Sequence, residues 1–353
     1  MHIDRLETPA LIVEEKILLQ NRIAMKALLK DSPLQLRPHY KSHKCAALAH
    51  MQMKDGAKGM TCAKLGEALD LADSGIEDIL IANQITDPKK IRRMAELAGD
   101  CRLTVCVDHA ENIDAIAKAA ADAGTTVHCL IEFDLGMERC GVTEPEAVLA
   151  LAERIGSHSH LCFDGIQAYA GHISHLADAR QRQALTTDYS ITIRSLLDLL
   201  EKHGMPAATL SGGSTGTSVL KAKEGLYTEL QAGSYLFMDS TYRKLELPFR
   251  NSLFLLSTVV SRRSGLTVVD AGVKTCGVEQ GMPVPTGGHV HHIVDSEEHF
   301  QLHGYTGKET PGERVLLIPG HCCSTVNLHD HLYIVDDGKV IDRLPITGRC
   351  IGR

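Results

Sequence analysis

Two lysines and two histidines crowd the segment from Arg37 to Lys44, which reads RPHYKSHK. A lysine amine that is desolvated in a pocket loses its proton readily and can form a Schiff base with an aldehyde. The segment follows an apolar run, so we interpret it as the end of a β-strand, along which alternate side chains face the same side. Lys41 then shares a polar face with Arg37 and His39 and becomes the candidate nucleophile, whereas Lys44 falls out of phase and is expected on the next helix.

Two turns rich in glycine and hydroxyl groups have the composition of a phosphate site. They span residues 211–217 (SGGSTGT) and 232–235 (AGSY), each directly after an expected strand. Backbone N–H groups in such turns can converge on an anion, and the last two loops of a parallel barrel often hold a phosphate. We therefore expect a phosphorylated cofactor or substrate at these turns.

Three histidine clusters have a spacing that suits a metal ion. His321 and Cys323 lie two residues apart, so on an extended segment their side chains face the same way and Cys322 faces the other way. Imidazole with thiolate suits zinc or another borderline divalent ion. Residues 289–292 (HVHH) and 329–331 (HDH) have equally good local spacing, so spacing alone does not rank the three clusters.

The elements that must position these residues alternate along the chain. Short apolar, β-branched runs are separated by amphipathic helical stretches, which is typical of parallel βα units. Eight such repeats within about 200 residues predict an α/β fold of the closed (β/α)8 TIM-barrel type, whose chemistry lies at the C-terminal ends of the strands. The expected strands are residues 34–39, 59–62, 79–82, 103–107, 127–133, 165–169, 208–210 and 227–230.

A change of pattern after residue 245 predicts a second, all-β domain. There, β-branched alternation with Gly and Pro turns replaces the helical stretches. The run from Pro9 to Val13 is one strand too many for the barrel, so we expect it to pair with this C-terminal domain. We therefore assign residues 14–244 to the barrel and residues 1–13 plus 245–353 to a β domain that carries the metal site and contains all three candidate clusters.

Composition narrows the class of function. The chain has 353 residues, 44% of them hydrophobic, and a formal net charge of -7 with scattered basic residues, which gives no footprint for nucleic acid or an anionic membrane. The N-terminus lacks a signal-peptide pattern and no apolar run is long enough to span a bilayer, so we expect a cytoplasmic protein with a small-molecule partner. Most of the 11 cysteines are expected to be free thiols.

Several segments together resemble one enzyme family. RPHYKSHK, ANQ at residues 82–84, YAGH at 169–172, SGGSTGT at 211–217, GSYLFMD at 233–239 and PGHCC at 319–323 are similar to the alanine-racemase-like enzymes. This group includes D-threonine aldolases, D-serine dehydratases, and 3-hydroxy-D-aspartate aldolases and dehydratases. The resemblance covers nearly the whole chain and implies a barrel followed by a β domain, assembled as a homodimer. It also implies two cofactors, pyridoxal 5'-phosphate (PLP) and a divalent metal ion, which is zinc or else manganese, magnesium or cobalt.

The resemblance also implies roles for individual residues. Lys41 corresponds to the Schiff-base lysine, Arg139 to the partner of the cofactor's phenolic oxygen, and Tyr169 to a catalytic residue near the pyridine ring. Without a carboxylate at the pyridine nitrogen the ring is a weaker electron sink, so a metal would have to help. The remaining implied ligands are Gln84, Ser214, Thr215, Gly233 and Ser234 for the cofactor, and His321 and Cys323 for the metal.

Two reactions of a small 3-hydroxy-D-amino acid fit this site. In β-elimination Lys41 removes the Cα proton and the metal carries off hydroxide, giving a 2-keto acid and ammonia. In retro-aldol cleavage the metal acidifies the hydroxyl, His175 takes its proton and the products are glycine and an aldehyde; His172, the other candidate base, is interpreted as a hydrogen-bonded loop residue. Cys323 favours elimination, because the family pairs His with Cys in dehydratases and more usually with Asp in aldolases. A racemase or a non-catalytic PLP carrier would leave the metal pair unexplained.

Overall fold

The structure is a computed structural model that describes residues 1–351. The chain forms two compact units. The β unit comprises Met1–Lys26, Ser42–Leu48 and Ser234–Cys350, and the barrel unit comprises Ala27–Lys41 and Ala49–Gly233, with Ile351. No helix within residues 1–351 is both long and apolar enough to cross a membrane.

Eight parallel strands build the barrel unit in the order β2-β9-β8-β7-β6-β5-β4-β3. A parallel bridge between His39 and Thr61 joins the two ends of this order, so the sheet closes on itself. The predicted (β/α)8 barrel is therefore confirmed. The strands are β2 (Gln35–Leu36), β3 (Met60–Cys62), β4 (Asp78–Ile81), β5 (Arg102–Val107), β6 (Val127–Glu132), β7 (Leu161–Ala168), β8 (Thr209–Gly212) and β9 (Glu229–Leu230).

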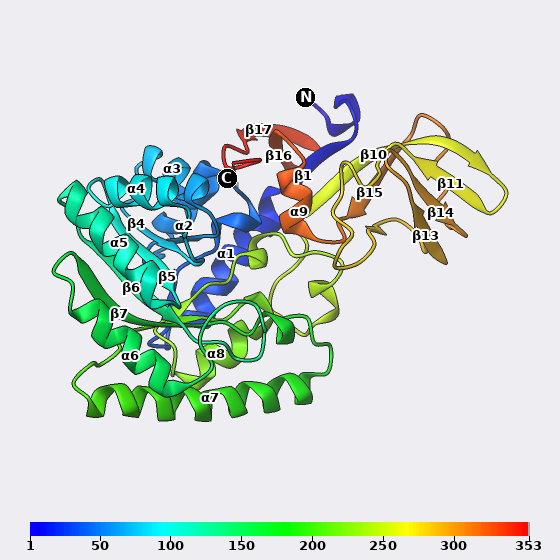
Figure 1. Ribbon diagram of the computed structural model, residues 1–353. Helices are drawn as coiled ribbons and strands as arrows, with labels where there is room; N and C mark the ends of the chain where they lie inside the picture. Colours follow the sequence, from blue (N-terminus) through cyan, green and yellow to red (C-terminus); the bar gives the residue numbers. More distant parts are fainter. Residues whose placement is uncertain (352–353) are drawn as a thin grey trace. The chain divides into compact units, whose positions relative to one another are not determined.

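Helices follow the strands and cover the outside of the barrel (Figure 1). Their ends follow ordinary capping chemistry. Helix α4 begins after Asp87, whose carboxylate accepts from the N–H groups of Lys89 and Lys90, and α5 ends at Gly124 with φ 66°. The barrel helices are α2 (Ala46–Lys54), α3 (Leu65–Asp73), α4 (Pro88–Leu97), α5 (Ala110–Ala123), α6 (Pro145–Gly156), α7 (Ala179–Lys202) and α8 (Ser218–Glu224). Helix α1 (Glu15–Leu29) precedes the first barrel strand, and most of it belongs to the β unit.

The inside of the barrel is apolar in the middle and charged at the N-terminal end of the strands. Leu80, Cys106 and Leu130 pack together as a buried cluster. Below them Arg37, which is 3% exposed, donates to Glu229 at 2.8 Å and to Asp78 at 2.7 Å. Asp78 and Glu229 begin their strands, so the Arg37 side chain faces away from the catalytic end. The expectation that Arg37 shares a polar face with Lys41 is wrong.

The β unit is a nine-stranded sheet in which β1 (Ala10–Glu14) pairs antiparallel with β10 and parallel with β16. The pairing expected for the run from Pro9 to Val13 is thus confirmed. The other strands are β10 (Leu253–Arg263), β11 (Leu266–Val269), β12 (Val284–Pro285), β13 (His292–Asp295), β14 (Phe300–His303), β15 (Arg314–Ile318), β16 (His331–Asp336) and β17 (Lys339–Pro345). A short helix, α9 (Cys322–Asn327), interrupts this all-β pattern.

Candidate active site

Lys41 is positioned by a turn and not by a strand. Strand β2 ends at Leu36, and Lys41 lies in the 3-10 turn Tyr40–Ser42. Strand alternation therefore does not determine where the Lys41 side chain lies. Lys44 also differs from expectation, because it lies in the loop before α2 with φ 49° and its ammonium donates to the carbonyl of Gly348.

The structure brings Lys41, Arg139 and Tyr169 together. The Nζ of Lys41 lies 5.9 Å from the centre of the Tyr169 ring, and the Cζ of Arg139 lies 5.8 Å from the same centre. Tyr169 directly follows β7, so the aromatic ring stands at the C-terminal end of the strands, where barrel enzymes carry out their chemistry. An amine and a guanidinium at one ring make an electropositive site suited to an anionic planar ligand.

Glu132 is a site residue that the sequence did not reveal. This carboxylate is 4% exposed, accepts from Nε2 of Gln84 at 2.7 Å, and lies 3.5 Å from Nη2 of Arg139. Glu132 thus connects two of the predicted cofactor residues. It ends an apolar strand, and the signal that could have found it is a single buried carboxylate at the catalytic end of β6.

The 211–217 turn contains one hydroxyl that the fold leaves available. The Ser214 hydroxyl accepts from Ser174 at 2.8 Å, and its backbone N–H donates to Thr217, so Ser214 holds the turn itself together. The Thr215 hydroxyl is buried and has no hydrogen-bond partner within residues 1–351. A buried hydroxyl without a partner costs free energy until a ligand satisfies it. Of the two, Thr215 therefore has the hydroxyl that is available to a phosphate.

His321 and Cys323 come together in the β unit, although the segment is not extended. His321 is the extended residue before α9, and Cys322 and Cys323 form its first turn, so the expected alternation is wrong. Burial opposes a charge on His321, but hydrogen bonds to Cys323 and Glu279 outweigh it and raise the pKa of His321 to about 9. Cys322 is fully buried, and the contact with Cys323 together with this burial raises the pKa of its thiol well above the usual range. Cys323 is half-buried.

Two carboxylates support this pair. Glu279 accepts from Nδ1 of His321, which leaves Nε2 as the nitrogen available to a metal. Asp239 is buried and accepts from the backbone N–H of Cys322 at 3.2 Å and from that of Tyr242 at 2.9 Å, so it anchors the start of α9. Neither carboxylate is recognisable as a supporting residue from the sequence alone.

The Cys323 thiol contacts two serines. Its Sγ lies 3.6 Å from the hydroxyl of Ser42 and 3.7 Å from that of Ser234. Ser42 directly follows Lys41 in the chain, and Ser234 directly follows Gly233. Ser234, which we predicted to be a phosphate ligand, thus has its hydroxyl beside the candidate metal ligand.

The rival histidine clusters are occupied otherwise. The rings of His292 and His303 stack at 4.4 Å across β13 and β14. His329 Nε2 contacts the carbonyl of Thr275 at 2.7 Å, and His331 Nδ1 lies 3.0 Å from Arg343. Within residues 1–351, neither rival cluster brings three potential metal-ligand atoms close to one another. His128, Cys162 and Asp164 do so elsewhere in the chain.

The two histidines after β7 differ in their surroundings. His172 is exposed and its Nε2 lies 2.7 Å from the hydroxyl of Tyr189, with the two rings in an edge-to-face contact, as expected for a loop residue held by hydrogen bonds. His175 is half-buried between the turn Gly171–Ile173 and α7.

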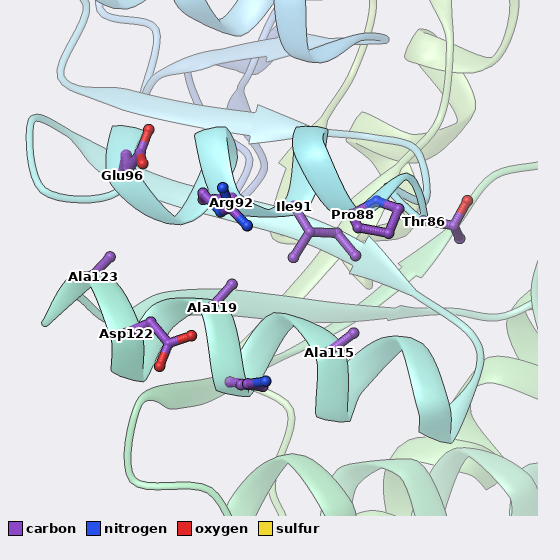
Figure 2. A pocket seen from close by; sticks show the side chains of 10 residues that line it. Thr86, Pro88, Ile91, Arg92, Glu96, Ala115, Ala119, Asp122 and Ala123 are labelled. Carbon is purple, nitrogen blue, oxygen red and sulfur yellow. The ribbon is translucent and has the colours of Figure 1, made fainter.

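A separate groove on the outside of the barrel, between α4 and α5, contains none of the predicted site residues (Figure 2).

Comparison with known proteins identifies the family. The alanine racemase N-terminal domain matches residues 16–241, and the putative serine dehydratase domain matches residues 252–335. The chain belongs to the alanine-racemase-like family. It is a fold-type III PLP lyase of the D-threonine aldolase, 3-hydroxy-D-aspartate aldolase and dehydratase group, which confirms the resemblance noted from its motifs.

Within the family the chain shares more identity with the aldolases. The D-threonine aldolase of Arthrobacter sp. is 37% identical over 99% of this chain and 94% of its own length. The 3-hydroxy-D-aspartate aldolase of Paracoccus denitrificans (strain Pd 1222) is 35% identical over 98% and 92%. The solved D-threonine aldolase of Filomicrobium marinum superposes with a TM-score of 0.95 at 34% identity, covering 98% and 97% of the two chains. The D-threo-3-hydroxyaspartate dehydratase of Delftia sp. is 26% identical over 91% and 92%.

The residues of the barrel unit fit the cofactor of this family. PLP presents an aldehyde, a phenolate and a phosphate, and the site offers the Lys41 amine, the Arg139 guanidinium and the available Thr215 hydroxyl. The phosphate turn is also tightly built. A side chain at residue 216 would bring its Cβ to 1.8 Å from the Ser174 carbonyl, so Gly216 keeps the turn closed.

Proposed function

We propose that the chain cleaves the Cα–Cβ bond of a small 3-hydroxy-D-amino acid by a metal-assisted retro-aldol reaction, giving glycine and an aldehyde. The observation that carries this proposal is the contact of Cys323 with Ser42 and Ser234, because it links a candidate metal ligand to the residues next to Lys41 and Gly233. The higher identity to two aldolases than to the dehydratase supports retro-aldol cleavage over the elimination that Cys323 alone favoured.

The barrel residues would bind and orient the cofactor. When bound, PLP withdraws the electrons of the bond that breaks at Cα. In our proposal Lys41 holds the cofactor through its amine, Thr215 donates a hydrogen bond to the phosphate, and Arg139 neutralises the phenolic oxygen. Glu132 keeps Gln84 and Arg139 in place through its contacts at 2.7 and 3.5 Å.

The β-unit residues would hold the metal and leave room for the substrate. Nε2 of His321 and Sγ of Cys323 supply two ligands, and a catalytic site needs open positions for water or a hydroxyl. A divalent ion there would polarise the substrate's β-hydroxyl. His175 is our candidate for the base that takes the hydroxyl proton on an imidazole nitrogen.

We also propose that the chain forms a homodimer, which size-exclusion chromatography tests.

A product assay tests the reaction. The purified enzyme with PLP is given D-threonine, D-threo-3-hydroxyaspartate and D-serine, with L-threonine as the stereochemical control. Retro-aldol cleavage of D-threonine releases glycine and acetaldehyde, and the L isomer should give neither. Formation of a 2-keto acid and ammonia in place of glycine would sink the proposal and establish β-elimination, the second candidate, which the thiolate of Cys323 supports.

A further inference from the structure

Three metal-ligating side chains meet at the end of the barrel opposite Lys41. His128 is the second residue of β6, and Cys162 and Asp164 lie near the start of β7, so all three stand at the N-terminal ends of the strands. Nδ1 of His128 lies 2.9 Å from Oδ1 of Asp164, and Sγ of Cys162 lies 3.4 Å from the same oxygen. All three ligand atoms lie within 4.8 Å of one another.

The strand is shaped to bring Asp164 into this cluster. Cys129 pairs with Phe163, but the next residue, Leu130, pairs with Gly165, so Asp164 is the extra residue of a bulge. Bulges are rare between parallel strands and re-aim the side chain they carry. Gly165 has φ 143°, and a Cβ there would lie 2.0 Å from the Thr209 carbonyl, so this position requires glycine. The sequence thus encodes the irregularity.

The spacing and the charge both suit zinc or a similar ion. Ligand atoms held about 2.0 to 2.3 Å from a tetrahedral zinc ion lie about 3.3 to 3.5 Å from one another. The contacts at 2.9 and 3.4 Å need to open by only a few tenths of an ångström. A thiolate and a carboxylate cancel the charge of a divalent ion, and a neutral imidazole adds none, so the complex would be uncharged where it is half-buried.

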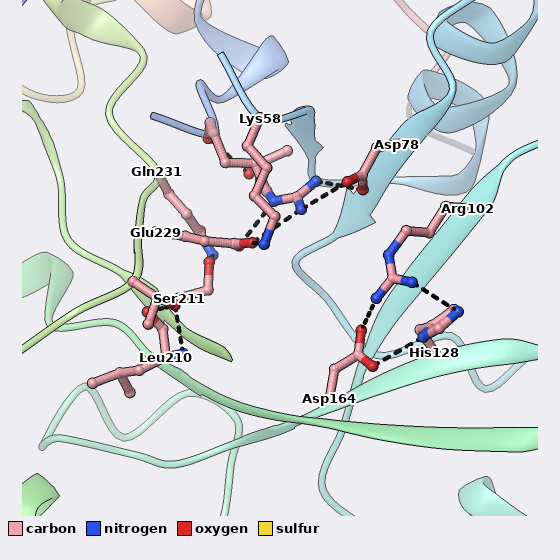
Figure 3. A network of polar contacts seen from close by, with 12 residues as sticks. Lys58, Asp78, Arg102, His128, Asp164, Leu210, Ser211, Glu229 and Gln231 are labelled. Atoms are coloured by element: carbon pink, nitrogen blue, oxygen red, sulfur yellow. Dashed lines mark hydrogen bonds and ion pairs between the residues drawn. The ribbon is translucent and has the colours of Figure 1, made fainter. Parts of the chain in front are cut away.

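Arg102 is compatible with the ion after one rearrangement. Its guanidinium donates to Oδ2 of Asp164 at 2.6 Å, which leaves Oδ1 to bind the metal, and a ligating carboxylate is normally held by such a partner (Figure 3). Arg102 also lies 3.2 Å from Nε2 of His128. That nitrogen must carry the proton when Nδ1 binds a metal, so Nη1 of Arg102, whose side chain is 46% exposed, has to move away from His128 while Nη2 stays on Asp164.

We propose that His128, Cys162 and Asp164 form a second metal site, for zinc or a similar borderline divalent ion. It lies at the N-terminal end of the barrel strands, away from Lys41, Arg139 and Tyr169. The ion would tie β6 to β7. It would take no part in turnover, because barrel enzymes carry out their chemistry at the opposite end, where the strands have their C-termini.

Cobalt titration tests the site. The full-length enzyme with PLP is stripped by a chelator and titrated with Co²⁺, whose thiolate complexes absorb in the near ultraviolet. Cys162→Ser and His128→Gln should each bind one Co²⁺ per chain fewer than the parent enzyme, while turnover of the remetallated enzyme stays within twofold. The difference between the proteins is the readout, so the result holds whether or not His321 and Cys323 bind a metal.

A matched thiol and a melting curve complete the test. Cys101 is also half-buried, and its Sγ contacts the Leu97 carbonyl at 3.6 Å, so Cys101→Ser should leave the Co²⁺ stoichiometry unchanged. Zn²⁺ should raise the Tm of the single variant Cys323→Ser. It should not raise the Tm of the double variant that carries both Cys162→Ser and Cys323→Ser. Equal Co²⁺ binding by Cys162→Ser, His128→Gln and the parent enzyme, or the same loss in Cys101→Ser, would overturn the proposal.

Discussion

The thiol of Cys323 lies 3.6 Å from the hydroxyl of Ser42, the residue that directly follows Lys41. Cys323 is the candidate thiolate ligand of a metal, and Ser42 is the chain neighbour of the candidate amine. His321, the other half of the metal pair, is held by Glu279 on the far side of its ring.

Lys41 should carry the cofactor and Lys44 should not. Lys41→Ala should lose the visible absorption of the lysine-bound cofactor and its turnover, because the Tyr40–Ser42 turn holds the Nζ of Lys41 5.9 Å from the centre of the Tyr169 ring. Lys44→Ala is the control, since its ammonium contacts the carbonyl of Gly348. An absorption band that survives in Lys41→Ala and disappears in Lys44→Ala would show that the assignment is reversed.

Thr215 should bind the phosphate through its hydroxyl. Thr215→Val removes that donor and should weaken cofactor retention by about 1 to 2 kcal/mol, or roughly 5- to 30-fold in Kd. Thr215→Ser should restore most of the affinity, and Gly233→Asp should lower it further by placing a carboxylate near the phosphate. Dialysis followed by PLP titration measures all three. Unchanged Kd values in Thr215→Val and Gly233→Asp would remove the phosphate assignment.

Metal removal should stop turnover without unfolding the chain. A chelator or Cys323→Ser should abolish product formation while the cofactor absorption changes little. Cys323→Ser should also leave the Tm nearly unchanged, because a site with two protein ligands contributes little to folding. Cys322→Ala should keep activity, since this thiol is fully buried at the start of α9. Full turnover after exhaustive chelation, or equal loss in both cysteine variants, contradicts the assignment of Cys323.

Glu132 should act as a positioning residue for Arg139 and Gln84. Glu132→Gln keeps the shape but removes the charge, so kcat should fall by about 5- to 150-fold, the equivalent of about 1 to 3 kcal/mol for a charged hydrogen bond. The cofactor spectrum should shift as well, which a purely structural role would not cause. Glu138→Gln is the matched control, because it removes the same charge at an exposed position nearby.

Arg37 should stabilise the fold and not the chemistry. Its guanidinium bridges Glu229 and Asp78 while only 3% exposed, so Arg37→Met leaves two carboxylates with one fewer cation. Breaking a buried ion pair costs about 3 to 5 kcal/mol, which urea unfolding measures. The double variant with Glu229→Gln should recover part of the loss. Lys58 also lies 2.7 Å from Glu229, so a change below about 1 kcal/mol would mean that Lys58 and water compensate fully.

The sequence by itself determined the barrel and the chemistry that the chain could offer. Alternation of apolar strands and amphipathic helices is a local property of side-chain periodicity, so all eight barrel strands could be predicted, as could the pairing of the run from Pro9 to Val13 with the C-terminal sheet. The motif around Lys41 and the pair His321 and Cys323 could also be found, because residue type and spacing are visible in one dimension.

Only the tertiary structure decided how these residues are held. Strand alternation failed at Lys41 and at Cys323, because a 3-10 turn and the helix α9 replace the extended backbone there. Glu132, Glu279 and Asp239 stayed hidden in the sequence, since a carboxylate becomes a supporting residue only when distant segments bring a cation or an N–H group within hydrogen-bond distance. The cluster of His128, Cys162 and Asp164 depends in the same way on tertiary structure. It forms because β6 pairs with residues 34 positions further along the chain in β7, and because a bulge carries Asp164.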